Sequence, residues 1–181
     1  MATGEKEKVT LGAGKWYVAP HESGAIDIST IAVEENIIGW TQGGAEITYT
    51  PEIYTIEDDI GMVRKVFQTK AEAEMKTGLL TFNMASIHAI MSVGEKEETE
   101  DKIVLKLTGG KSSLRKFAVV FVYEDDETGL KTRVGMIASN TSPLKFVFAK
   151  DKETVVDAVF TATSNGVDDT LVVIEEDKVA A

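Results

Sequence analysis

The sequence predicts a mainly β protein, a β-sandwich or barrel with a long β-hairpin and one flanking α-helix over about residues 81–93. Three observations lead to this fold class. Apolar and polar residues alternate with period two over an unusually long stretch, residues 62–77. Further apolar segments follow one another with turn signals about every 8–12 residues, as in sandwiches and barrels. Only one segment has its apolar residues at helical spacing.

The long hairpin is predicted at residues 44–77. Within 62–77 the odd positions are mostly small or apolar and the even positions mostly polar, which places one face on a core and the other in water. Residues 45–50 alternate in the same way, and we assign Pro51, 57–59 and Gly61 to the connection. A strand of this length would span about 50 Å, so it needs a partner of similar length.

The helix is predicted to begin after Thr81 as N-cap and to end at Gly94. Its apolar stripe is wide enough to be covered on more than one side, either by its own sheet or by a neighbouring subunit, and both alternatives remain open. Segment 21–44 is rich in isoleucine without a clean period, and it is interpreted as an arm or loop that docks on another chain. The candidates for contact between subunits are Phe82, Met84, Ile87, Met91, Ile31, Ile37 and Ile38.

Further strands are expected in the second half of the chain, and no linker or change of composition divides it. These strands are predicted at 102–108, 116–123 (apolar on both faces, hence central), 133–137, 144–149, 153–163 and 171–175. Residues 1–181 are therefore interpreted as one domain, with an N-terminal arm or loop region at about 1–43.

Composition excludes several classes of function. Lys and Arg number 19 against 30 Asp and Glu, a net charge of −11, which disfavours stable binding of nucleic acid. The chain contains no cysteine, so disulfides, thiolate metal sites and cysteine nucleophiles are excluded. No apolar run approaches the ~20 residues that cross a bilayer, and the polar segment Met1–Lys8 is not typical of a secretory signal.

No motif predicts catalysis. Segments 110–112 and 14–15 resemble the end of a phosphate-binding loop but lack its other glycine, and 113–116 lacks the partner motifs of acyl-transfer enzymes. The only histidines, His21 and His88, lie too far apart in the sequence to suggest a zinc site. The acidic clusters are interpreted as solvated turns. We therefore predict a protein that is not an enzyme, with no cofactor, metal or catalytic residue.

The order of segments resembles that of the major tail tube proteins of tailed phages, of the kind found in phages of Gram-positive bacteria. The resemblance covers nearly the whole chain and is carried by segments 9–18, 38–47, 61–65 and 148–160, with the hairpin and helix between them. It implies hexameric rings, in which the hairpins join into a continuous inner barrel, stacked into a tube through which the genome passes. It also implies a virion tail location, with assembly in the host cytoplasm, and tape measure and tail terminator proteins as partners.

Under this hypothesis the polar face of the hairpin lines the lumen, and DNA passes it transiently without stable binding. The lumen-lining candidates are Glu46, Thr48, Thr50, Arg64, Gln68, Lys70, Glu72, Glu74 and Lys76. Their acidic and basic groups are nearly balanced. The main alternative is a monomeric ligand- or carbohydrate-binding β-barrel module, although aromatic residues make up only 7% of the chain. An enzyme with dispersed acidic residues ranks last.

Overall fold

Antiparallel strands account for most of the regular structure in the computed structural model, which describes residues 14–57, 60, 64–80, 83–148, 150–151 and 153–178. The strands are β1 (Lys15–Pro20), β2 (Thr41–Glu57), β3 (Arg64–Leu79), β4 (Glu95–Glu98), β5 (Ile103–Lys106), β6 (Phe117–Glu124), β7 (Lys131–Asn140), β8 (Val156–Ala162) and β9 (Val172–Glu176). The helical segments are α1 (Ile28–Ile31), the 3-10 helix η1 (Glu34–Asn36) and α2 (Met84–Ile90). The predicted mainly β class is confirmed.

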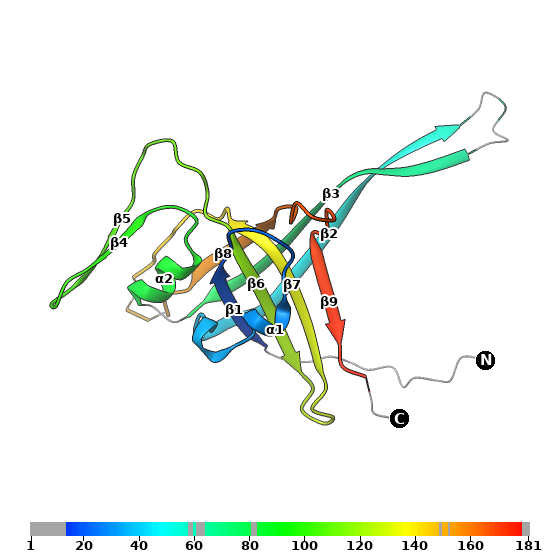
Figure 1. Ribbon diagram of the computed structural model, residues 1–181. Helices are drawn as coiled ribbons and strands as arrows, with labels where there is room; N and C mark the ends of the chain where they lie inside the picture. Colours follow the sequence, from blue (N-terminus) through cyan, green and yellow to red (C-terminus); the bar gives the residue numbers. More distant parts are fainter. Residues whose placement is uncertain are drawn as a thin grey trace.

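Seven strands form one sheet in the order β1-β6-β7-β8-β3-β2, with β9 pairing along β7 beside β8. Strands β4 and β5 form a separate two-stranded sheet. Figure 1 shows two hairpins leaving the body in opposite directions, β2–β3 on one side and β4–β5 on the other. The predicted long hairpin is therefore confirmed, and its strands extend slightly beyond 44–77 at both ends.

The main sheet curls, so that side chains from its separated strands meet in one core. The rings of Trp16 on β1 and Phe160 on β8 stack with centroids 6.3 Å apart, although β6 and β7 lie between these strands in the sheet. On the opposite face, Ile28 of α1 packs against Val120 of β6. A Cβ atom at Gly135 of β7 would lie 2.9 Å from Ile28, so glycine permits this close approach. Burial on both faces confirms that β6 is central.

The predicted helix is present but shorter than expected. Asn83 is its N-cap, and the side chain accepts a hydrogen bond from Ser86 N at 2.7 Å, whereas Thr81 lies outside the described residues. The helix ends at Ile90, because Met91 is extended and Ser92 bonds instead to neighbouring segments through its backbone and hydroxyl oxygens. The sequence predicted a longer helix because Met91 is apolar and buried, although the helix has already ended there.

Part of the predicted N-terminal arm belongs to the subunit's own sheet. Strand β1 pairs with β6 along its whole length, and Tyr17 forms a bridge with Ile37. The Ile38 amide donates to the carbonyl of Trp16 at 3.2 Å. The interpretation that segment 21–44 docks on another chain is corrected for residues 28–38, which pack on their own subunit because Ile28 and Ile38 fill its two apolar clusters.

One strand prediction is wrong, and one strand was not predicted. Residues 144–148 form no strand: Leu144 and Phe146 pack at the edge of the core, which explains the alternating pattern, but their backbone joins no ladder. Conversely, residues 95–98, three glutamates and one lysine, form β4 by pairing with β5, although no strand was predicted there. Charged residues suit an exposed two-stranded sheet, and so this strand carries no hydrophobic signal.

Candidate assembly surface on the long hairpin

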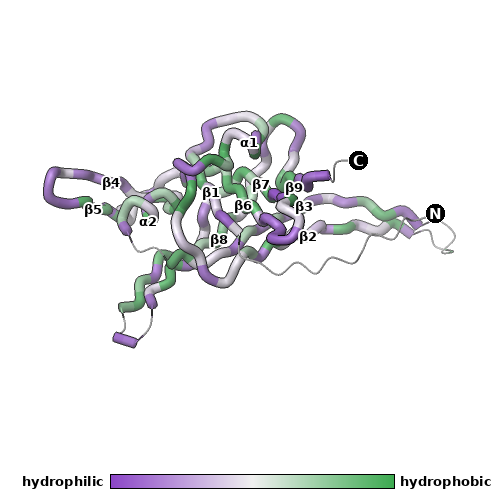
Figure 2. The backbone as a smooth tube through the Cα atoms, turned by 90° about the horizontal axis from the view of Figure 1, so that it is seen from below, coloured by the Kyte–Doolittle hydropathy of each residue, from purple (hydrophilic) through white to green (hydrophobic). Residues whose placement is uncertain are grey.

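The β2–β3 hairpin projects because only its base is joined to the main sheet. Strand β3 pairs with β8 from Glu74 to Leu79, whereas residues 64–73 have β2 as their only described strand neighbour. Figures 1 and 2 both show this distal part leaving the body. The hairpin therefore exposes two strand edges, the outer edge of β2 and the distal edge of β3, and exposed edges pair readily with other chains. An isolated two-stranded hairpin is marginally stable in water.

Pro51 lies inside β2, opposite Ala71, so its assignment to the connection is wrong. Proline lacks the N–H group that a central strand needs, and it is tolerated in edge strands. Strand β2 is the last strand of the sheet within the described chain, which explains how the strand continues through Pro51.

One face of the proximal hairpin is polar and carries exposed ion pairs. The pairs Glu46–Lys76, Thr48–Glu74 and Thr50–Glu72 lie opposite one another across the two strands. The Lys76 ammonium is 3.4 Å from both Glu46 and Glu74. A hydrogen bond from Lys70 lowers the pKa of the Glu72 carboxyl. These exposed pairs order the side chains and contribute little to stability.

A β-bulge halfway along the hairpin reverses the face to which the residues of β3 nearer the tip point. Glu52 lies opposite Lys70 and the next residue, Ile53, lies opposite Gln68, so Thr69 is the extra residue. The Gln68 amide donates to the Tyr49 hydroxyl at 3.1 Å, which places it on the face of Tyr49. Arg64 follows on this face through its pairing with Glu57. Strict alternation predicts that all nine lumen candidates share one face. This prediction is wrong for Arg64 and Gln68, because the bulge places them on the opposite face.

Large apolar side chains are exposed on both faces of the distal hairpin. Ile53 is 62% exposed, Tyr54 58% and Phe67 47%, and Ile56 and Val66 are similarly exposed. Adjacent residues of a strand point to opposite faces, so Ile53 and Tyr54 make both faces apolar. Figure 2 shows hydrophobic stretches in this region. Sequence reasoning missed this surface; its signal is the adjacent apolar pairs Ile53–Tyr54 and Val66–Phe67, which break the alternation.

Three of the seven predicted subunit-contact residues lie within the subunit's own core. Ile87, Met91 and Ile38 are buried, because α2 and the segment before β2 cover their own sheet. This corrects the assignment of these three residues and favours the alternative in which the helix covers its own sheet. Met84, Ile31 and Ile37 are half-buried, and Phe82 lies outside the described residues. For the half-buried residues, contact with a neighbour stays a prediction.

His88 connects α2 to the loop before β6. The Arg115 guanidinium Nη1 lies 3.0 Å from His88 Nε2, and Nη2 donates to the carbonyl of Gly94. Desolvation, together with the positive charges of Arg115 and Lys96, lowers the pKa of His88 below its usual 6.5. Neutral His88 accepts from Arg115, and protonated His88 would repel it. These contacts join α2 to the loop before β6 and to Gly94.

Stability is therefore expected to fall as the pH drops below 6.5. Because the folded state resists protonation of His88, the unfolded state binds more protons there, and the free energy of unfolding decreases. His88→Gln keeps an acceptor for Arg115 but does not titrate, so its melting temperature should depend less on pH between 7.5 and 5.5. Thermal melts of both proteins test this. Equal pH dependence in the two proteins would contradict it.

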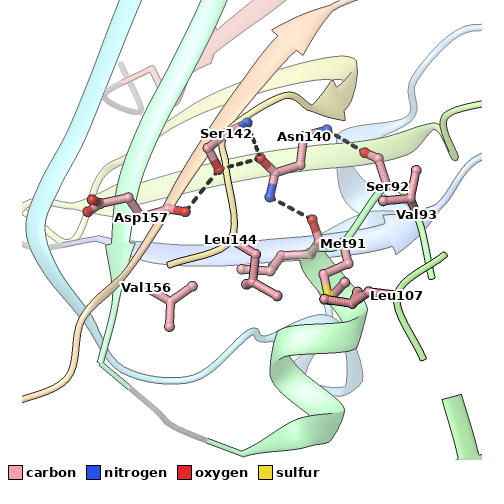
Figure 3. Close-up of a pocket in the computed structure, with 10 residues that line it drawn as sticks. Met91, Ser92, Val93, Leu107, Asn140, Ser142, Leu144, Val156 and Asp157 are labelled. Carbon is pink, nitrogen blue, oxygen red and sulfur yellow. Dashed lines mark hydrogen bonds between the residues drawn. The ribbon is translucent and has the colours of Figure 1, made fainter. Parts of the chain in front are cut away.

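A pocket of about 180 Å³ lies between α2, the loop after β5 and the loop after β7. Figure 3 shows that its polar groups bind one another. The Asn140 side chain donates to the Ile90 carbonyl and accepts from Ser142, and the Ser142 hydroxyl donates to the Asp157 carbonyl. The remaining wall is mainly aliphatic, from Met91, Leu107 and others. The hydrogen bonds fix the loops and leave few polar groups directed at a ligand.

No protein-family model matches the chain, and no curated protein matches it. Within the described residues, the helices are all too short or too polar to cross a membrane.

Proposed function

We propose that this protein is a structural subunit that assembles through its long hairpin into stacked hexameric rings, forming a phage tail tube that conducts the genome. The main support for this proposal is the hairpin, because its distal half has two open strand edges and exposed apolar residues on both faces. Such a ribbon is incomplete in one subunit, and pairing with neighbouring copies would close its edges and bury its apolar residues.

The charge of the polar face supports a conduit for DNA. The bulge removes Arg64 from this face and places Lys65 on its distal part, opposite Ile56. Glu52 joins the face through its pairing with Lys70. Between residues 46–52 and 70–76 the face then carries four carboxylates and two ammonium groups. Duplex DNA bears one negative charge per about 1.7 Å, so an acidic lining would repel it and prevent sticking. The proposal therefore keeps Glu46, Thr48, Thr50, Lys70, Glu72, Glu74 and Lys76 as lumen residues.

Direct observation of the assembly tests the proposal. Negative-stain electron microscopy and sedimentation velocity over increasing protein concentration should show rings or tubes of even width. Among residues 64–73, the amides that point away from β2 should exchange fast in monomers and slowly in assemblies, because neighbouring copies supply the missing backbone partners. A monomer that already protects these outward amides would contradict the proposal.

No specific observation favours a ligand-binding module. The pocket beside α2, at about 180 Å³, is smaller than the ~300–1,000 Å³ usual for small-molecule sites. Its polar groups are also already bonded to one another.

Reversing charge on the polar face should make assembled tubes bind DNA. Glu72→Lys with Glu74→Lys leaves two carboxylates and four ammonium groups on the face, and both residues are exposed enough for the fold to tolerate the change. Tubes of this variant should retain linear duplex DNA in co-sedimentation at 50 mM salt and release it as salt rises. Tube formation should be unchanged.

The matched control is Glu34→Lys with Glu35→Lys, which makes the same charge change on the exposed η1 segment. If both double variants retained DNA equally, net charge rather than the hairpin face would be responsible. That result would remove the support for the lumen assignment.

A further inference from the structure

The loop that joins β8 to β9 (Figure 1), residues 163–171, contains the only asparagine of the chain that is followed by glycine. The other asparagines, Asn36, Asn83 and Asn140, precede larger residues. The side-chain amide of an asparagine is open to attack by the backbone nitrogen of the next residue, which closes a cyclic imide. Glycine obstructs this attack least, because it has no side chain and restricts the backbone least. Asn165 and Gly166 therefore offer the least steric resistance to this reaction in the chain.

The attacking nitrogen has a route for its proton. Gly166 N donates to Ser164 Oγ at 3.1 Å, and the Ser164 hydroxyl donates in turn to Asp169 Oδ1 at 2.8 Å. A hydroxyl bound to a carboxylate accepts one proton as it passes its own to that carboxylate, which is general base catalysis through a relay. Asp169 reaches this position with a left-handed backbone, φ 59°. Among residues other than glycine, Asp and Asn tolerate this conformation better than most.

The carbonyl under attack is polarised by the same loop. Asn165 Oδ1 accepts from Val167 N at 2.8 Å and from Asp168 N at 3.1 Å. As the Gly166 nitrogen adds to the side-chain carbon, Oδ1 gains negative charge, and two backbone N–H groups directed at it form an oxyanion hole. Asn165 Nδ2, the leaving group, donates to Asp168 Oδ1, and this hydrogen bond lowers the pKa of the Asp168 carboxyl. The ionised carboxylate attracts the positive charge that Nδ2 gains on protonation.

We propose that Asn165 modifies itself: the folded loop promotes its cyclisation onto Gly166 and the hydrolysis of the ring to aspartate or isoaspartate. The bond from Gly166 N to Asn165 Cγ forms, the bond from Cγ to Nδ2 breaks, and ammonia leaves. The Gly166 proton passes through Ser164 to Asp169, which returns it to solvent, and the departing nitrogen takes one proton from solvent. A cavity of about 50 Å³, lined in part by Asn165 and Thr170, has room for water. Water adds to one of the two ring carbonyls and opens the ring, so the net reaction replaces ammonia by water without oxidation or reduction.

The product carries one more negative charge and loses a hydrogen bond. A carboxylate then stands where the Asn165 amide donates to Asp168, and two neighbouring carboxylates repel each other. The modification therefore loosens the loop that precedes β9. This inference goes beyond the proposed function, since it concerns the loop between β8 and β9 and does not depend on assembly through the hairpin.

The decisive measurement compares the folded wild-type chain with the same chain unfolded in urea. Both are incubated at neutral pH and digested, and mass spectrometry of the peptide that contains Asn165 gives the rate of conversion to aspartate and isoaspartate. The rate should be at least about tenfold higher in the folded chain, because only the folded loop holds the relay and the two N–H donors in place. Asn36 in the same samples serves as the internal reference. An equal or lower rate at Asn165 in the folded chain would overturn the inference.

Two variants test the proton relay. Asp169→Asn keeps an acceptor for the Ser164 hydroxyl and tolerates the left-handed backbone, but its amide cannot take up the proton. Ser164→Ala removes the hydroxyl. Each should lower the rate at Asn165 in the folded chain at least about tenfold, whereas Asp101→Asn, the same change at an exposed residue outside the loop, should leave it unchanged.

Circular dichroism and thermal melts check that each variant is folded. Unchanged rates in both loop variants would also overturn the inference. The comparison of folded and unfolded wild-type protein decides it even where a variant fails to fold.

Discussion

Replacing Tyr54 and Phe67 with threonine is expected to prevent assembly at concentrations where the wild-type protein forms rings, while the subunit stays folded. The two residues face each other across the hairpin and are 58% and 47% exposed. Full burial of an aromatic side chain contributes about 1.5–3 kcal/mol. Since roughly half of each ring is already covered, contact with a neighbour would contribute about 1 kcal/mol per ring.

Losing about 2 kcal/mol per subunit raises the concentration needed for assembly roughly 30-fold. Threonine is chosen because it favours strands and pairs well with threonine across an antiparallel ladder, so the hairpin itself should persist. Sedimentation velocity and electron microscopy measure assembly, and a thermal melt measures folding.

The matched control is Val167→Thr, which removes an exposed apolar side chain from a loop far from the hairpin in the sequence. It should assemble like the wild type. Normal assembly of the double variant would show that the apolar side chains of the distal hairpin are not buried between copies. Unfolding of the double variant would instead show that these rings support the subunit itself.

How far the sequence predicts this structure depends on how locally each element is determined. The hairpin and the central strand β6 were predictable from their patterns of apolar residues. The base of β3 is buried on one face and β6 on both, and each kind of burial leaves its own pattern in the sequence. The helix was predictable in its existence but not in its end, since Met91 is buried by tertiary contacts after the backbone has become extended. Residues 144–148 alternate like a strand because Leu144 and Phe146 reach the core from a loop.

The candidate site was predictable only in part, for a geometric reason. A single bulge at Thr69 exchanges the faces of every residue beyond it, so Gln68 and Arg64 leave the face of Lys70. No local preference of threonine marks that position. Adjacent apolar residues in the sequence indicate that the distal hairpin is apolar on both faces. Whether a neighbouring copy buries these residues depends on the assembly, which the sequence of one chain does not describe.

The core supports the hairpin through Phe160, and its loss is expected to have the largest effect on stability. Phe160 is fully buried, stacks on Trp16 and lies opposite Met75 at the base of β3. Phe160→Ala should lower the free energy of unfolding by about 3–5 kcal/mol, because the surrounding core cannot collapse to fill the cavity. At about 2–4 °C per kcal/mol for a chain of this size, the melting temperature should fall by roughly 6–20 °C.

Phe148→Ala is the matched control, because it makes the same chemical change at a residue that is 77% exposed. Its effect should stay within about 0.5 kcal/mol. Thermal and denaturant unfolding of both variants compare the two sites. Because β8 is the only strand besides β2 that pairs with β3 within the described chain, Phe160→Ala should also speed hydrogen exchange in Glu74–Leu79. Slow exchange there, despite the lost stability, would show that the hairpin is held by β2 alone.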